Sequence, residues 1–117
     1  MDDLLHFVES PIFTKRIDRL ASVDVLVALQ NELLEDPMLG DLMPGCGGAR
    51  KARIGDKSQR RGKSGAFRYV YVYIEIAGTI YLITFYGKNE KANLSKAEQN
   101  EVASLVKELK RVYGKKG

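Results

Sequence analysis

The stretch Gly65–Ile76 (GAFRYVYVYIEI) has the clearest strand pattern in the chain, because two sets of side chains alternate along it. One face would carry Phe67, Tyr69, Tyr71 and Tyr73, and the other Arg68, Val70, Val72, Ile74 and Ile76. β-Branched and aromatic residues at a period of two indicate a strand. The dipeptide Ala77-Gly78 predicts a tight turn, so 79–86 is expected to pair back as the next strand. Both faces of this hairpin are apolar, so we expect both to be covered.

The tyrosine stripe has two interpretations. Aromatic side chains on a strand are more often core than a platform on which RNA bases stack, and we expect core here. The preceding segment 49–54 alternates in the same way and is expected to be a strand with Lys51 and Arg53 on one face.

Two helices are expected upstream of these strands. Ser10-Pro11 is typical of an N-cap followed by proline at the first helical position, which predicts a helix over 11–20. Ser22 is the next N-cap, for a helix that ends near Glu35, before Pro37. A short strand is expected at 4–9, where His6 would be partly buried. The apolar stripes of the two helices would be Ile12, Phe13, Ile17 and Leu20, then Leu26, Leu29, Leu33 and Leu34.

A third helix closes the chain. Ser95-Lys96-Ala97-Glu98 is a capping box, and it predicts a helix to about Tyr113. Its apolar residues recur at helical spacing: Val102, Leu105, Val106, Leu109, Val112 and Tyr113. The fold class expected from these elements is α+β, with an N-terminal helical hairpin packed on a twisted antiparallel sheet. We expect a single domain over 1–113 and a basic tail at 114–117.

Composition excludes several classes of protein. The chain has 117 residues, 44% hydrophobic and 29% charged, which is ordinary for one globular domain. It contains no apolar run near the roughly 20 residues that span a bilayer, and its start lacks the basic flank of a signal peptide. The expected location is therefore the cytoplasm. One cysteine and one histidine, Cys46 and His6, are too few for a zinc site.

Positive charge is concentrated in one segment. Positions 50–68 carry eight Lys or Arg side chains against a single acid, Asp56, whereas positions 1–49 have a net charge of −6. Such polarity is expected of a protein that binds a polyanion, most commonly a phosphate backbone. The alternative is a solvated basic loop, but this segment lies among glycines and leads directly into a strand.

Familiar catalytic motifs do not fit. Gly62-Lys63-Ser64 resembles the end of a phosphate-binding P-loop, but the glycine required five positions earlier is Lys57. Gly45-Cys46-Gly47-Gly48 is too short for a dinucleotide fingerprint and predicts a turn with positive φ. No Ser/His/Asp set is present, nor paired carboxylates for a metal. The cations could instead support metal-free cleavage of RNA, in which the 2′-hydroxyl attacks the adjacent phosphorus and arginines offset the developing charge.

The combined pattern resembles a known family. Pro37-x-x-Gly40, Pro44-Gly45-x-Gly47-Gly48-x-Arg50-Lys51-x-Arg53, Gly62-Lys63-x-Gly65-x-x-Arg68-x-x-Tyr71, Tyr86-Gly87-Lys88-Asn89-Glu90 and Leu94-Ser95 are similar to segments of the RelE/HigB-like toxins of type II toxin–antitoxin systems. The resemblance implies a small α/β fold with a helical hairpin on a sheet. It also implies a ribosome-dependent mRNA endoribonuclease that needs no metal or cofactor. Its partners would be the ribosome, mRNA and a cognate antitoxin, which is expected to be of helix-turn-helix type. The toxin would contact operator DNA only through this antitoxin.

Site residues follow from the same motif positions. The resemblance assigns catalysis to Lys51, Arg53, Arg68, Lys88 and Asn89, and we expect the four cations among them to converge on one surface. RNA binding is expected of Arg50, Lys57, Arg60, Arg61 and Lys63.

The chain departs from the family in places. Cys46 replaces the usual threonine and Ala66 the usual second glycine before Arg68. Ser95 stands where some members place a catalytic tyrosine, so the general acid and base stay open. Tyr71 or Tyr86 could substitute only by facing the basic cleft. The alternative function is a non-catalytic nucleic-acid-binding or regulatory module of the same fold.

Overall fold

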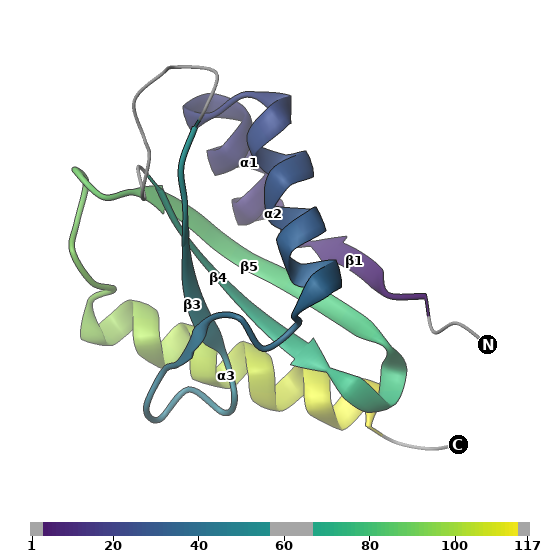
Figure 1. Ribbon diagram of the computed structural model, residues 1–117. Helices are drawn as coiled ribbons and strands as arrows, with labels where there is room; N and C mark the ends of the chain where they lie inside the picture. Colours follow the sequence, from purple (N-terminus) through teal and green to yellow (C-terminus); the bar gives the residue numbers. More distant parts are fainter. Residues whose placement is uncertain (1–3, 57–66, 115–117) are drawn as a thin grey trace.

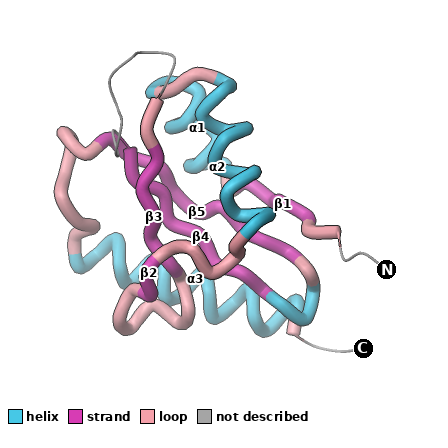
Figure 2. The backbone as a smooth tube through the Cα atoms, viewed as in Figure 1, coloured by secondary structure: helices cyan, strands magenta, loops and turns pink. Residues whose placement is uncertain are grey.

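The computed structural model describes residues 4–56 and 67–114, which form a five-stranded sheet between two helical layers (Figure 1). The sheet order is β1-β5-β4-β3-β2, so the longest strands are central (Figure 2). Helices α1 and α2 lie on one side of the sheet and α3 crosses the other side (Figure 1). The elements are β1 (His6–Glu9), α1 (Pro11–Leu20), α2 (Val23–Glu35), β2 (Asp41–Leu42), β3 (Arg50–Ile54), β4 (Phe67–Ile74), β5 (Thr79–Gly87) and α3 (Lys96–Tyr113).

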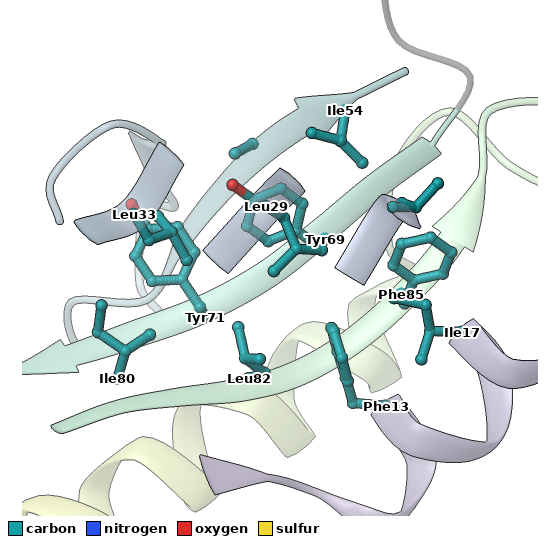
Figure 3. Packing of buried hydrophobic residues seen from close by; sticks show 12 residues of the cluster. Phe13, Ile17, Leu29, Leu33, Ile54, Tyr69, Tyr71, Ile80, Leu82 and Phe85 are labelled. Atoms are coloured by element: carbon teal, nitrogen blue, oxygen red, sulfur yellow. The ribbon is translucent and has the colours of Figure 1, made fainter. Parts of the chain in front are cut away.

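Strand β4 separates two apolar cores because its side chains alternate. Tyr69 and Tyr71 are fully buried beneath α1 and α2, where Figure 3 shows them near Leu29 and Leu33. Val70 and Val72 point to the other side and pack with the buried residues of α3, including Val106. The expectation that the tyrosines form core is confirmed, as is the covering of both faces. Each large apolar side chain buried in this way contributes about 1.5–3 kcal/mol.

The sheet is mixed, whereas a fully antiparallel sheet was expected. β1 pairs with β5 in parallel, with His6 opposite Thr79 and Glu9 opposite Leu82. A parallel neighbour requires a long crossover, and here α1, α2 and three further strands supply it. The junction with α1 is fixed by Ser10, whose hydroxyl donates to the Ile83 carbonyl at 2.7 Å. The β4–β5 register shifts between Val70 and Tyr71, so Ile83 has no partner in that ladder, which is a β-bulge.

The bounds of the helices agree with the sequence, but parts of their apolar stripes do not. Ser10 Oγ caps α1 by accepting from Phe13 N–H, and Ser95 forms the expected capping box with Glu98. Ser22 makes no side-chain capping bond. In α2 the buried residues are Val25, Leu29 and Leu33, since residues four apart share a face and the next position, Leu34, is rotated by 100° toward solvent. Ile12 and Val112 are likewise exposed, and so is His6, which was expected to be partly buried.

The connection between β4 and β5 is longer than the predicted two-residue turn. β4 ends at Ile74, a 3₁₀ turn follows over Glu75–Ala77, and Gly78 adopts a left-handed conformation with φ 58°. Ile76, expected on the strand, lies on this turn and is exposed. The extra residues let the chain reverse while Ile74 still pairs with Thr79.

The predicted glycine turn before β3 is present and touches α3. Gly45, Gly47 and Gly48 all have positive φ. A Cβ on Gly47 would lie 3.0 Å from Val106 Cγ1, so the backbone packs directly on the helix. Cys46 is buried in this turn. No helix of the described part is both long enough and apolar enough to cross a membrane.

Candidate nucleic-acid interface

Register places three of the expected catalytic cations on one face of the sheet. Arg53 and Arg68 are Cα partners in the antiparallel β3–β4 ladder, so their side chains leave the same face. Lys51 lies two positions before Arg53 and opposite Val70, which packs against α3. The three cations therefore share the α3 side of the sheet.

These three residues line a cleft of about 650 Å³. The cleft lies at the edge of the sheet, because β2 is only two residues long and pairs with Arg50 and Lys51 alone. Two carboxylates, Glu32 and Asp41, line the same cleft. The cleft therefore combines three cations with two carboxylates.

Lys51 lies between this cleft and a second one. Its ammonium group donates to Asn93 Oδ1 at 3.0 Å, a contact that joins β3 to the segment before α3. The second hollow, of about 390 Å³, shares Lys51 and Asp41 with the first and adds Asn93 and Gln99. The two hollows therefore adjoin at Asp41 and Lys51 along the edge of the sheet.

Arg50 is separated from this set. It pairs with Tyr71, on the face opposite Lys51, and its guanidinium donates to the carbonyl of Gly40 at 2.8 Å and that of Met38 at 3.3 Å. Arg50 thus supports the connector before β2 and does not line the cleft.

Lys88 and Asn89 follow the end of β5 in an exposed turn. Gly87, the last residue of β5, is opposite Phe67, so the turn begins beside the neighbour of Arg68. Glu90 closes it: its N–H donates to the Gly87 carbonyl, and its carboxylate binds Arg16 of α1 at 2.5 Å. Neither Lys88 nor Asn89 lines the cleft.

Of the two tyrosines considered as an acid or base, Tyr71 lies on the face opposite the cations, whereas Tyr86 is the Cα partner of Arg68 and shares its face. The Tyr71 hydroxyl donates to the Pro37 carbonyl at 2.8 Å and accepts from Gly40 N–H at 2.9 Å. Burial raises the pKa of Tyr71 above its usual value, and the Gly40 hydrogen bond opposes the shift. Burial also raises the pKa of Tyr86, against the effect of the Arg68 charge. Neither phenol lines the cleft, and Ser95 is used as the helix cap.

The sequence analysis did not identify the carboxylates Glu32 and Asp41 or the amide Asn93 as residues of this site. Asp41 starts a two-residue strand and Asn93 belongs to an irregular segment, and neither has a periodic pattern around it. The proximity of Asp41 to Lys51 could be found only from the β2–β3 register. The expected RNA-binding residues Lys57, Arg60, Arg61 and Lys63 lie outside the described residues, as do Ala66 and the tail at 115–117.

Known structures share this fold, although no family model matches the chain. A free-state mutant of the E. coli toxin RelE superposes with a TM-score of 0.57 at 17% identity, covering 87% of this chain and 96% of that one. The isolated E. coli RelE toxin gives 0.52 at 20% identity, with 86% and 98% covered. The chain has the RelE fold. The RelE-like architecture expected from the sequence is thereby confirmed. At this identity the likeness demonstrates the fold alone.

Proposed function

We propose that this chain is the toxin of a type II toxin–antitoxin pair and that it inhibits translation by cleaving mRNA on the ribosome. The observation that carries the proposal is the group Lys51, Arg53 and Arg68, which lines one cleft on one face of a RelE fold. Three cations with no more than two acids in the same cleft suit a substrate that presents several phosphates.

The reaction that fits these residues is attack of an RNA 2′-hydroxyl on the adjacent phosphorus. Arg53 and Arg68 can each present parallel donors to the non-bridging oxygens as charge builds on them. Lys51 adds a third cation, whose direction is set by Asn93. Stabilisation of this kind is typically worth about 3 kcal/mol per donor in the transition state.

The ribosome would supply what the chain does not. A cleft open at the edge of a sheet does not force RNA into the in-line geometry that attack requires, and alignment is a large part of the barrier. Binding in the ribosomal A site would fix the mRNA backbone while the toxin brings its cations to it. We therefore expect purified protein to cut free RNA poorly. The protein would act in the cytoplasm, with ribosomes and mRNA as targets.

A cognate antitoxin, expected to be a helix-turn-helix protein from the same operon, would neutralise the toxin. Contact with operator DNA would take place only through that antitoxin. A second function, a non-catalytic nucleic-acid-binding or regulatory module, is favoured by one observation: Ser95, which by the resemblance stands where some members place a catalytic tyrosine, is the N-cap of α3.

Induction in growing cells separates the two functions. A catalytic toxin halts growth when the chain is expressed, and Arg68→Ala restores growth at the same protein level. A binding module leaves growth nearly unchanged in both cases. Cleavage is then measured directly on mRNA in programmed ribosomes, with Lys107→Ala, on the exposed face of α3, as the matched charge control. Growth arrest without mRNA cleavage would refute the nuclease.

A further inference from the structure

We propose that the Asp41 carboxylate is the general base that removes the proton from the attacking 2′-hydroxyl; this assignment rests on the proposed nuclease function. The attack requires a proton acceptor as well as cations. Arginine cannot be deprotonated in a protein, so Arg53 and Arg68 cannot accept one. Lys51 is already engaged, because its Nζ donates to Asn93 Oδ1 at 3.0 Å.

Asp41 is at the right place on the sheet. It is the first residue of β2 and the Cα partner of Lys51, so the two side chains leave the same face. Arg53 follows Lys51 by two positions on that face, and Arg68 is its partner on β4. The carboxylate therefore stands at one end of a row of cations. A phosphate held by the row would have its flanking ribose beside Asp41.

The backbone of Asp41 is anchored by its neighbour Gly40. Gly40 N–H donates to the Tyr71 hydroxyl, and the Gly40 carbonyl accepts from Arg50. A Cβ at Gly40 would lie 2.8 Å from the Lys51 carbonyl oxygen, so only glycine allows this close approach of β2 to β3. Because the backbone of Asp41 is already fixed, little conformational entropy is lost when its carboxylate is brought to the substrate. A general base requires such fixed positioning.

The side chain of Asp41 remains available. Within residues 4–56 and 67–114, its carboxylate makes neither a hydrogen bond nor an ion pair, and it lines both hollows. The charged groups that line the cleft with it are Lys51 and Arg53 of β3, Arg68 of β4 and Glu32 of α2. Three of these four are cations, so the groups that would hold a phosphate lie beside the carboxylate.

Glu32 is the competing carboxylate, and its position disfavours it. It belongs to α2, on the side of the sheet where Tyr69 is buried, and its charge acts on the Tyr69 hydroxyl. Lys51, Arg53 and Arg68 leave the opposite face. Glu32 therefore forms the far wall of the cleft, whereas Asp41 shares a face with the cations.

The step balances without a further reactant. The 2′-oxygen forms a bond to phosphorus as its proton passes to the Asp41 carboxylate, and the bond from phosphorus to the 5′-oxygen breaks. The leaving 5′-oxygen takes a proton from water, and Asp41 returns its own proton to solvent. The products are a 2′,3′-cyclic phosphate and a 5′-hydroxyl.

The test is single-turnover cleavage on programmed ribosomes with saturating protein, measured from about pH 4 to 8, a range that includes the region near pH 4 in which an aspartate carboxyl ordinarily titrates. The wild-type rate is expected to rise with pH and level off. Asp41→Asn should lose on the order of 100-fold or more in rate and lose the acid limb, with ribosome binding unchanged. Asp41→Glu should keep the limb at a reduced rate. Asp18→Asn, on the exposed face of α1, is the matched control and should behave as wild type.

Three results would overturn the assignment. The first is a wild-type rate in Asp41→Asn, and the second is a reduced rate in Asp41→Asn with the acid limb still present, which would make Asp41 a structural residue. The third is loss of the acid limb in Glu32→Gln instead, which would assign the role of general base to Glu32 of α2. Absence of mRNA cleavage by the wild-type chain is a separate result: it refutes the proposed nuclease, and the assignment to Asp41 falls with it.

Discussion

Arg53 and Arg68 face each other as direct partners across the β3–β4 ladder. Like charges at such a position destabilise a sheet, typically by a few tenths of a kcal/mol to about 1 kcal/mol. A bound polyanion would account for two arginines at this position, because its negative charge would offset the repulsion between the two guanidinium groups.

Replacement of Arg53 should therefore separate stability from activity. Arg53→Gln removes one of two like charges that face each other, so we expect a midpoint of thermal unfolding equal to or slightly above that of the wild type. Cleavage on programmed ribosomes should fall on the order of 100-fold. Lys107→Gln, an exposed cation of α3, should change neither quantity. A clear loss of stability in Arg53→Gln would mean that the side chain has a structural function.

Arg68 and Arg61 are expected to have different roles, Arg68 in the cleavage step and Arg61 in the binding of RNA. Arg68 is held on a rigid strand, whereas Arg61 belongs to the basic segment outside the described residues and should attract RNA by charge alone. At saturating protein, Arg68→Ala should lower the cleavage rate about a hundredfold and Arg61→Ala should leave it nearly unchanged. Arg61→Ala should instead weaken binding modestly and reduce its salt dependence by about one counterion. Equal losses of rate at saturation would place the basic segment inside the active site.

Much of this architecture could be predicted because it follows local patterns. The period-two alternation of β4, the proline after Ser10 and the capping box at Ser95 each determine structure within a few residues, and all three agree with the fold. The parallel pairing of β1 depends instead on contacts between Ser10 and β5, 73 positions apart. No local pattern encodes such a contact.

The candidate site divides in the same way. Lys51 and Arg53 could be placed on one face from alternation, and Arg68 from the motif. Asp41 could not, because a strand of two residues has no period, and its relation to Lys51 exists only through pairing with β3.

Two buried tyrosines should respond oppositely to loss of the hydroxyl. The Tyr71 hydroxyl bridges the Pro37 carbonyl and Gly40 N–H, so Tyr71→Phe should cost about 1–3 kcal/mol in the free energy of unfolding. The Tyr86 hydroxyl is buried and has no hydrogen-bond partner among the described residues, so Tyr86→Phe should be neutral or stabilising. Chemical denaturation of both variants measures the difference. Equal costs would show that Tyr86 has a partner after all, such as an ordered water.

The start of α3 should make stability depend on pH in the acid range. Glu98 accepts from Lys91 and from the N–H of Ser95, and these hydrogen bonds lower the pKa of its carboxyl below the ordinary value. A lowered folded-state pKa means that the stabilisation is fully present above the unfolded-state pKa and is lost as pH falls through the folded-state pKa. Stability of the wild type should thus decline as the solution is acidified below about pH 4.5, the region where a glutamate in an unfolded chain titrates.

Glu98→Gln isolates this contribution. The amide can still accept from Ser95 N–H but cannot form the ion pair with Lys91, so the variant should be less stable near pH 7 and approach the wild type at low pH. Ser95→Ala, which removes the other half of the capping box, should cost about 1 kcal/mol at every pH. Glu101→Gln is the control, since Glu101 is exposed and is not part of the capping box formed by Ser95 and Glu98, and it should leave the difference between neutral and acid stability unchanged. The measurement is urea unfolding at a series of pH values; if Glu98→Gln and wild type differ by a constant amount throughout, the ion pair with Lys91 does not contribute to the stability of the folded chain.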